Sequence, residues 1–279
     1  MAGTILIIGA FDSKGEEYAF VRGLIIGNGF DVLTVNTGVM GETDLFPVDI
    51  PASAVAEAGG TNLEELRRKK DRGEAITVMS EGVPKIVSEL FRDGRFDGII
   101  GMGGTAGTAV TTAAMRALPI GVPKVCISTV ASGDTSRLVG LKDITMIPSV
   151  VDVAGLNRVS RKIFTRAAGA ICGMTAARIP EDTSDRAVIA ATMFGNTTDC
   201  IKFCSRQLTA RGAEVLVFHA TGTGGRTMES LVDEGLVDAV LDITTTEWAD
   251  HICGGVFDAG AERLTAPGRR GIPHLIVPG

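Results

Sequence analysis

Aromatic and basic residues are scarce in this chain of 279 residues. It has one Trp and one Tyr, and 33 acidic residues outnumber 27 Lys and Arg, which leaves a formal charge of −6. Proteins that bind nucleic acid use a basic surface and aromatic side chains that stack on bases. The composition therefore argues against a nucleic-acid partner. The basic run Arg67–Lys70 stands among Glu64, Glu65 and Asp71, so we interpret it as a solvated helix face.

Long hydrophobic runs and paired cysteine motifs are also missing. No apolar run approaches the roughly 20 residues that a membrane-spanning helix needs. The first apolar run, residues 4–8, is too short for a signal peptide and has no basic lead. The five cysteines form neither a CxxC pair nor a Cys/His metal spacing, which is typical of a reducing compartment. We therefore expect a cytoplasmic protein without a membrane partner.

Glycine is abundant. The chain has 36 glycines, whereas the average usage of about 7% would give roughly 20. Most of them stand at the ends of short apolar runs rather than in a low-complexity tract. This placement predicts many tight turns between strands and helices.

The first half of the chain follows the pattern of an open parallel sheet. Residues 4–8 and 31–35 are apolar strands, and a helical pattern over residues 15–27 separates them, which is a βαβ unit. Residues 38–73 break the rhythm and indicate an insertion with short helices. Further on the patterns predict helices over 76–91, 105–118 and 157–177, and strands over 97–101, 124–128 and 144–146.

A polar segment over residues 178–185, which contains Pro180, indicates a domain boundary. Beyond it the opening pattern returns, because residues 188–222 repeat the order of strand, helix, strand and Thr-Gly found over residues 5–38. The pattern predicts strands over 187–191, 214–219, 236–243 and 274–277, and helices over 196–209 and 246–254. We expect an α/β protein with two Rossmann-like, doubly wound parallel-sheet domains. The first, residues 1–180, binds the nucleotide, and the second, residues 181–279, is partial, since a parallel strand normally feeds a crossover.

The strongest local signal for function is the loop Gly101–Thr108. It follows a strand and opens a helix, where glycines permit close approach, and outward amides and the helix dipole favour an anion. The alternative is a plain turn with Thr105 as the helix cap. The glycine spacing is not GxGxxG, and GK[ST] is absent, so neither a dinucleotide fingerprint nor a P-loop is present. The candidate phosphate-binding residues here are Gly103, Gly104, Thr105, Ala106, Gly107 and Thr108.

Polar residues also follow the other strands of the first half. Ligands of open α/β sheets lie outside the carboxyl ends of the strands, where these loops converge. The candidates are Asp12, Ser13 and Lys14 after the first strand, Thr37 after the second, and Ser132, Gly133 and Asp134 after the fourth. Lys14 could meet a phosphate, and Asp12 a ribose or a metal-bound water. The alternative makes Asp12 or Ser13 a helix cap and Lys14 a solvated charge.

Equivalent loops occur in the second half. The candidates are Asn196 and Thr197 after one strand, and His219, Gly224 and Gly225 after the next. His219 could act as an acid or base, or could simply be hydrogen-bonded. No metal cage and no nucleophile elbow can be identified, although Mg²⁺ beside a bound polyphosphate fits the many acids of these loops.

These loops together resemble a known family. The carrying motifs are Gly9-Ala-Phe-Asp-Ser-Lys-Gly-Glu16, Asn36-Thr-Gly38, Gly101–Thr108, Ser128-Thr-Val-Ala-Ser-Gly-Asp134, Phe194-Gly-Asn-Thr-Thr198 and His219-Ala-Thr-Gly-Thr-Gly-Gly225. They are similar over essentially the whole chain to the tomato mosaic virus resistance protein-like ATP-binding family and its bacterial relatives. The resemblance implies two Rossmann-like domains, ATP bound mainly by the first, and a homodimer. It also implies that Asp12, Ser13, Lys14, Gly103, Gly104, Thr105, Gly107 and residues 132–134 border the nucleotide.

Three functional hypotheses follow. The first is an ATP-binding protein, with Mg²⁺ and an unidentified small-molecule substrate in a cleft between the domains. The second is a protein-interaction module that ATP stabilises without turnover. The third is an enzyme acting on a sugar nucleotide, which rests on fold analogy alone.

Overall fold

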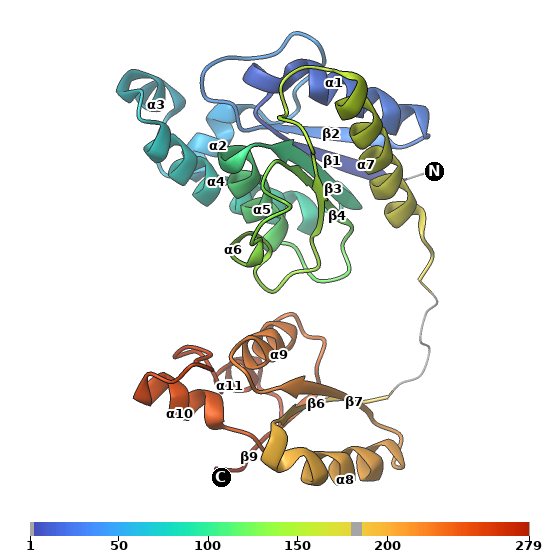
Figure 1. Ribbon diagram of the computed structural model, residues 1–279, viewed down its shortest axis with the longest axis vertical. Helices are drawn as coiled ribbons and strands as arrows, with labels where there is room; N and C mark the ends of the chain where they lie inside the picture. The colour runs from blue at the N-terminus through green and yellow to red at the C-terminus, as the bar shows by residue number, and fades with distance from the viewer. Residues whose placement is uncertain (1–2, 180–185, 279) are drawn as a thin grey trace. The chain divides into compact units, whose positions relative to one another are not determined.

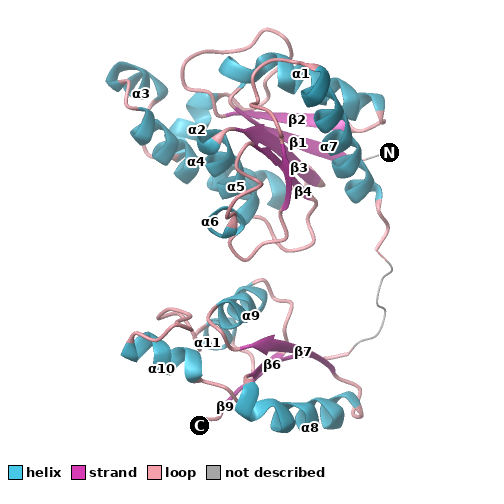
Figure 2. Cartoon of the chain, in the orientation of Figure 1, coloured by secondary structure: helices cyan, strands magenta, loops and turns pink. Residues whose placement is uncertain are grey.

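We describe a computed structural model of the chain, over residues 3–179 and 186–278. Contacts between residues divide the chain into two units, Met1–Ile179 and Pro180–Gly279. Most of the boundary segment predicted from the sequence, Pro180 to Asp185, lies outside the described residues. Each unit is described by itself (Figures 1 and 2).

The first unit is a parallel sheet of five strands in the order β2-β1-β3-β4-β5, with helices on both faces (Figure 1). The strands are β1 (Thr4–Gly9), β2 (Asp31–Asn36), β3 (Gly98–Gly103), β4 (Lys124–Ser128) and β5 (Thr145–Pro148). The helices are α1 (Phe11–Gly27), α2 (Ala52–Ala58), α3 (Leu63–Lys69), α4 (Arg72–Arg92), α5 (Thr105–Arg116), α6 (Ser136–Val139) and α7 (Arg158–Ala176).

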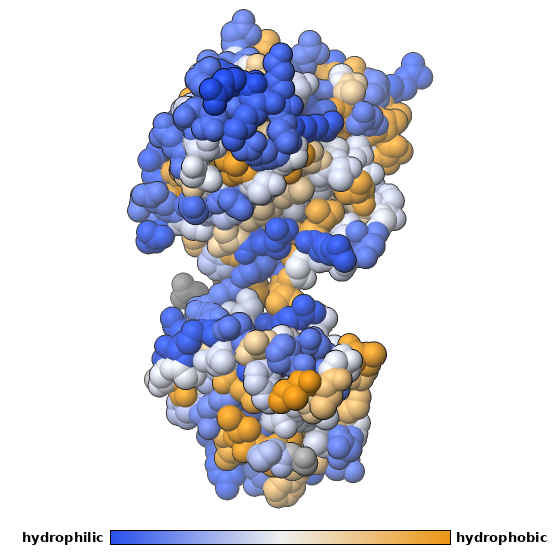
Figure 3. Space-filling view, turned by 90° about the vertical axis from the view of Figure 1, so that its left-hand side faces the viewer, coloured by the Kyte–Doolittle hydropathy of each residue, from blue (hydrophilic) through white to orange (hydrophobic). Residues whose placement is uncertain are grey.

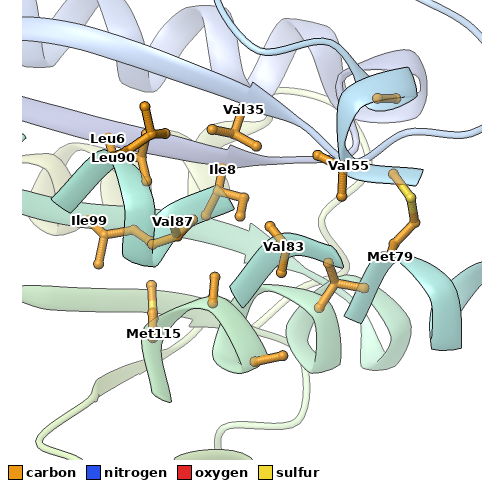
Figure 4. Packing of buried hydrophobic residues seen from close by; sticks show 14 of the residues in the cluster. Leu6, Ile8, Val35, Val55, Met79, Val83, Val87, Leu90, Ile99 and Met115 are labelled. Carbon is orange, nitrogen blue, oxygen red and sulfur yellow. The ribbon is translucent and has the colours of Figure 1, made fainter. Parts of the chain in front are cut away.

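The run Ile5–Ile8 shows why β1 lies at the centre of this sheet. Alternate residues of a strand point to opposite faces, so a strand that is apolar throughout needs cover on both. Leu6 and Ile8 pack against α2, α4 and α5, as Figure 4 shows, while Ile5 and Ile7 pack against α1 and α7. All four side chains are buried, which confirms the buried parallel strand expected from the sequence.

The second unit repeats this architecture with four parallel strands in the order β7-β6-β8-β9. The strands are β6 (Val188–Met193), β7 (Glu214–His219), β8 (Ala239–Asp242) and β9 (His274–Ile276). The helices are α8 (Thr198–Thr209), α9 (Thr223–Asp233), α10 (Thr246–Cys253) and α11 (Ala266–Arg270), with a 3-10 turn over Gly195–Thr197. The strand order matches that of β2-β1-β3-β4, so the repeat seen in the sequence is a repeat of topology. Two Rossmann-like parallel-sheet units are thereby confirmed.

One helix begins earlier than its sequence predicts. Helix α1 starts at Phe11, but Lys14 has non-helical angles (φ −136°, ψ 30°), so a short turn that contains Asp12 and Ser13 precedes a kink, and the helix predicted from Gly15 follows it. Its N-cap residue is Ala10, which has no capping side chain, and the Phe11 amide instead donates to Asn36 Oδ1 at 3.1 Å. The cap therefore comes from the end of another strand. Local sequence carries no signal for it.

No helix among the described residues is long and apolar enough to cross a membrane. Cys126 and Cys172 are buried and pack as apolar residues, while Cys200 and Cys253 are exposed. Burial raises the pKa of Cys126 to about 12, so this thiol stays protonated at neutral pH. Hydrophilic residues cover much of the first unit in Figure 3.

Candidate functional site

A cavity of about 630 Å³ opens in the first unit at the carboxyl ends of its strands. Five of the residues predicted from the sequence line it, namely Asp12, Ser13, Thr37, Ala106 and Gly107. They come from the first turns of α1 and α5 and from the loop after β2. The convergence of strand-end loops expected from the sequence therefore produces a real hollow.

Tyr18 holds the strand ends beneath this cavity in place. Its buried hydroxyl accepts a hydrogen bond from the Met102 amide at 2.9 Å and lies 2.9 Å from the Ile8 carbonyl and 2.8 Å from the Met102 carbonyl. Burial raises the pKa of Tyr18 above its usual range, so the group is a permanent donor. A Cβ on Gly9 would lie 1.7 Å from the Tyr18 oxygen, which explains glycine at the end of β1.

We expect Tyr18→Phe to lower the stability of the first unit by about 1–3 kcal/mol, because buried backbone groups lose their partner. Urea unfolding followed by far-UV circular dichroism measures this loss. Fluorescence of Trp248, the chain's one tryptophan, reports the second unit and should keep its midpoint. Equal shifts in both signals would contradict a clamp confined to the first sheet.

The loop after β2 supplies a polar group without a protein partner. Asn36 Oδ1 accepts from both Phe11 and Gly38 amides, at 3.1 and 2.9 Å, and so fixes the loop against α1. The Thr37 amide donates to the Gly9 carbonyl at 2.8 Å. Thr37 is 8% exposed and lines the cavity, yet its hydroxyl has no hydrogen-bond partner among the residues the structure describes. An unpaired hydroxyl that keeps some exposure within the cavity is available to a ligand.

The first turn of α5 presents free backbone donors to the same cavity. The N-cap is Gly104, and no side chain caps the helix, so the alternative of Thr105 as the cap is not realised. The first intrahelical bond runs from the Thr108 amide to the Gly104 carbonyl at 2.8 Å. The amides before it have no acceptor within the helix and carry the positive end of its dipole. This turn therefore has the free donors that an anion site needs, and the binding of an anion there stays a prediction.

Asp12 has a structural task. Its Oδ2 accepts from the Met40 amide at 2.8 Å, and a Cβ on Gly38 would lie 2.4 Å from the Asp12 carboxylate. Asp12 therefore shapes the loop that forms one wall of the cavity. Its role toward a ribose or a metal stays a prediction.

Several predicted residues lie outside the cavity lining. The Lys14 ammonium donates to the Val153 carbonyl instead of entering it. Thr108 is buried, and its hydroxyl is 2.7 Å from Ser128 Oγ. The loop 132–134 is exposed, and Asp134 Oδ1 accepts from the Ser136 amide at 2.9 Å. Their contact with a nucleotide remains a prediction.

The insertion contributes residues that the sequence analysis did not select. The cavity is also lined by Val39, Met40, Leu66, Lys70, Asp71, Arg72, Ile76 and Met79, which come from the loop after β2, α3, α4 and the turn between the helices. They were missed because neither the insertion over residues 38–73 nor the predicted helix over 76–91, which contains Ile76 and Met79, has a strand-to-helix motif. The sequence offered one signal for them. The pair Thr37-Gly38 at the start of the insertion recurs as Thr221-Gly222 after the second strand of the later half.

In the second unit, the glycine-rich loop is already filled by a carboxylate. Glu247 Oε1 accepts from the Gly222 and Gly225 amides at 2.7 and 2.9 Å, and a Cβ on Gly225 would lie 2.0 Å from Glu247 Oε2. Gly224 likewise packs against backbone, since its Cβ would lie 1.8 Å from the His219 carbonyl oxygen. The Glu247 carboxylate thus occupies the loop in which Gly224 and Gly225 were predicted to contact a ligand.

A buried arginine organises this carboxylate and two others. Arg263 is 2% exposed and donates to Asp242 at 2.5 and 2.6 Å, to Glu247 at 2.8 Å and to Glu229 at 3.1 Å. Burial alone would raise the pKa of Asp242. Hydrogen bonds from His274, Arg263 and Thr192 outweigh it and hold this pKa below its ordinary value. The network joins the ends of β8 and β9 to the glycine-rich loop.

The remaining candidates of the second unit lie near the carboxyl ends of β6 and β7. Asn196 is exposed, and Thr197 Oγ1 lies 2.6 Å from Thr244 Oγ1. The exposed His219 ring makes an edge contact with Phe194, at 5.5 Å between ring centroids. No hydrogen bond of the His219 ring is found among the described residues, so its acid–base role stays a prediction. Among all residues that the structure describes, no group of three or more His, Cys, Asp or Glu side chains is placed to hold a metal ion.

Comparison with known proteins identifies the family. The N-terminal domain of an uncharacterised protein family, UPF0261, matches residues 3–180, and its C-terminal domain matches residues 186–279. The chain belongs to the UPF0261 family. A member from Clostridium tetani is 48% identical over 99% of this chain and 68% of its own length. A member from Rhizobium meliloti is 44% identical over 97% of this chain and 66% of its own. The chain thus spans about two thirds of these relatives.

The resemblance to the tomato resistance protein is also confirmed. The ToMV resistance protein Tm-1(GCR237) of Solanum lycopersicum is 43% identical over 75% of this chain and 28% of its own length. Among solved structures, the glycosyltransferase SsfS6 of Streptomyces sp. SF2575 with thymidine diphosphate covers 99% of this chain and 82% of its own, at 13% identity. Its TM-score is only 0.29, so the likeness adds nothing about a ligand.

Proposed function

We propose that the first unit binds a phosphate-bearing nucleotide, ATP, in the cavity at the carboxyl ends of its strands. The observation that carries this is that the uncapped first turn of α5 lines the same cavity as Thr37, whose hydroxyl has no partner among the described residues. At about 630 Å³ the cavity falls within the range of small-molecule sites, roughly 300–1,000 Å³. The motifs shared with the ATP-binding family favour ATP among the nucleotides.

The lining divides into groups suited to different parts of a nucleotide. The amides at the start of α5 are placed to hold a phosphate, since they have no acceptor within the helix. The hydroxyls of Ser13 and Thr37 add donors. Val39, Ile76 and Met79 form an apolar wall suited to a base. In this proposal Mg²⁺ binds together with the polyphosphate, whose oxygens complete its coordination.

Calorimetric titration of the chain with ATP and Mg²⁺ tests the proposal. We expect saturable binding, with a thermal shift of the first unit that grows with nucleotide concentration. Absence of both heat and thermal shift at millimolar ATP, also with a full-length family member, would refute it. A parallel screen with ADP, adenosine and UDP-sugars distinguishes a nucleotide site from a sugar-nucleotide site.

Thr37→Val is expected to weaken ATP binding about five- to tenfold, because one hydrogen bond to the ligand is lost. The fold should keep its stability, since the hydroxyl has no protein partner among the described residues. Thr34→Val is the contrasting variant. Its hydroxyl lies 2.8 Å from Asp49 Oδ2 and outside the cavity lining, so its loss should cost stability and leave affinity intact.

A turnover assay separates an enzyme from an interaction module. The module predicts ATP binding without release of ADP or phosphate, and a homodimer whose dissociation constant falls when ATP is added. Sedimentation of the chain with and without ATP measures the second property. Release of phosphate that depends on an added small molecule would instead identify an enzyme.

A further inference from the structure

The turn between α3 and α4 brings two cations to the cavity. The run Arg67–Lys70 was interpreted from the sequence as one solvated face, but the structure divides it. Arg67 pairs with Glu64 at 2.9 Å, and Lys69 pairs with Glu74 at 2.7 Å. Lys70 and the nearby Arg72 line the cavity, and their side chains have no hydrogen bond or ion pair with any described residue. Two positive charges therefore remain available there.

The two acids of the same lining are used within the protein. Asp12 accepts the Met40 amide, as described above, and Asp71 caps α4 through the Glu74 amide, at 3.0 Å from Oδ1. Each holds a backbone segment in place. The side chains of Lys70 and Arg72 have no such contact with a described residue, so they are the lining cations that can move to meet a ligand.

The backbone of Lys70 adds an independent observation. Lys70 is the C-cap of α3 and has φ 54° and ψ 24°, the left-handed conformation. Helices that end in this conformation usually place glycine there, because a side chain strains the backbone. Twelve glycines of the described chain take positive φ, whereas Lys70 is one of three other residues that do. Glycine would therefore fit this position with less strain than the lysine that is found there.

We propose that Lys70 and Arg72 form an anion subsite that binds the phosphates of the ligand in this cavity. The inference rests on the proposed nucleotide site and extends it to residues outside the family motifs. The amides of α5 hold one phosphate, and the two cations of the α3–α4 turn neutralise the charge of the remaining chain. Arginine suits this task through its planar donors and lysine through its mobile point charge. In Figure 3 hydrophilic residues gather over the side of the first unit that carries α3.

The test compares Lys70→Met, Arg72→Met and the double variant by calorimetry with ATP, ADP and adenosine. We expect each single variant to lose about tenfold in ATP affinity and the double variant more, with adenosine binding changed less than about twofold. The salt dependence of ATP binding should become shallower in parallel. Arg68→Met is the matched control, because Arg68 belongs to the same basic run and does not line the cavity.

Lys70→Gly provides a readout that a merely structural lysine would not give. Glycine relieves the left-handed backbone, so the melting temperature of the unliganded variant should stay equal or rise. ATP affinity should nevertheless fall as in Lys70→Met. Loss of affinity together with loss of stability would show that Lys70 acts through the fold, and the subsite would be wrong.

Two failures remain distinguishable. If the unaltered chain binds ATP and the Lys70 and Arg72 variants bind it equally well, the subsite is wrong and the nucleotide site stands. If the unaltered chain binds no nucleotide but binds inorganic tripolyphosphate, and Lys70→Met with Arg72→Met abolishes this, the nucleotide proposal is wrong and the subsite stands. If neither probe binds, both proposals fall.

Discussion

Arg263→Met is expected to unfold the second unit at far lower urea concentrations than the unaltered chain. The loss should reach about 3–5 kcal/mol, the range found when one partner of a buried ion pair is removed. Without the guanidinium, the carboxyl groups of Asp242, Glu229 and Glu247 lose their shared counter-ion in a site where Arg263 and Asp242 are almost fully buried. Methionine keeps an unbranched apolar side chain and lacks the guanidinium, so the variant removes the charge and its hydrogen bonds.

Fluorescence of Trp248 measures the unfolding of the second unit. Trp248 is the chain's one tryptophan and follows Glu247 on α10. Arg269→Met is the matched control, because Arg269 also pairs with two acids but its side chain is 43% exposed. Exposed ion pairs contribute at most about 1 kcal/mol, so this variant should unfold near the normal midpoint. If the two variants shift the Trp248 transition equally, the buried network is not what stabilises the unit.

The same network predicts how stability depends on pH. Asp242 has a pKa below its ordinary value in the folded state, so it binds a proton more readily when unfolded. Its contribution to stability is full above the ordinary pKa and is lost as the pH falls through the folded value. The Trp248 unfolding midpoint should therefore fall as the pH drops below about 4. This slope should be shallower in Arg263→Met.

The second large effect is expected from Gly103→Ala. A Cβ there would lie 2.8 Å from Gly107 Cα and 3.2 Å from the Thr108 nitrogen, so the start of α5 must move. Backbone cannot rotate away as a side chain can, and we expect a loss of about 1–3 kcal/mol in the first unit. The displaced amides should also lower ATP affinity about tenfold or more.

Gly104→Ala is the matched control one residue later. The nearest atom to its added Cβ would be Thr129 Oγ1, at 3.9 Å, and its φ is −74°, so the fold has room for alanine. Stability should remain normal in this variant. Far-UV circular dichroism in urea and calorimetry with ATP measure both properties. If Gly103→Ala behaves like Gly104→Ala, close packing of the loop on α5 does not set the position of the amides.

Much of the fold could be predicted from the sequence because it depends on local periodicity. The run Ile5–Ile8 is apolar at every position, which requires cover on both faces and hence a parallel sheet. Glycines near the ends of many apolar runs mark the turns, and the repeated order over residues 188–222 indicates the second unit. The first turn of α1 was missed because its cap is Asn36, which lies 25 residues away from Phe11.

The position of the cavity could likewise be predicted from the sequence, since parallel strands end at one edge of the sheet and their loops converge there. Only the tertiary structure decided which side chains line the cavity at that edge of the sheet. Lys14, at the end of the first strand, is taken by the Val153 carbonyl, whereas Lys70 of the insertion lines the cavity. Glu247 takes the glycine-rich loop of the second unit, and α5 of the first unit keeps its amides free. Side chains far apart in the chain can bind the same backbone groups. Their spacing along the sequence does not show which side chain forms the contact in the folded protein.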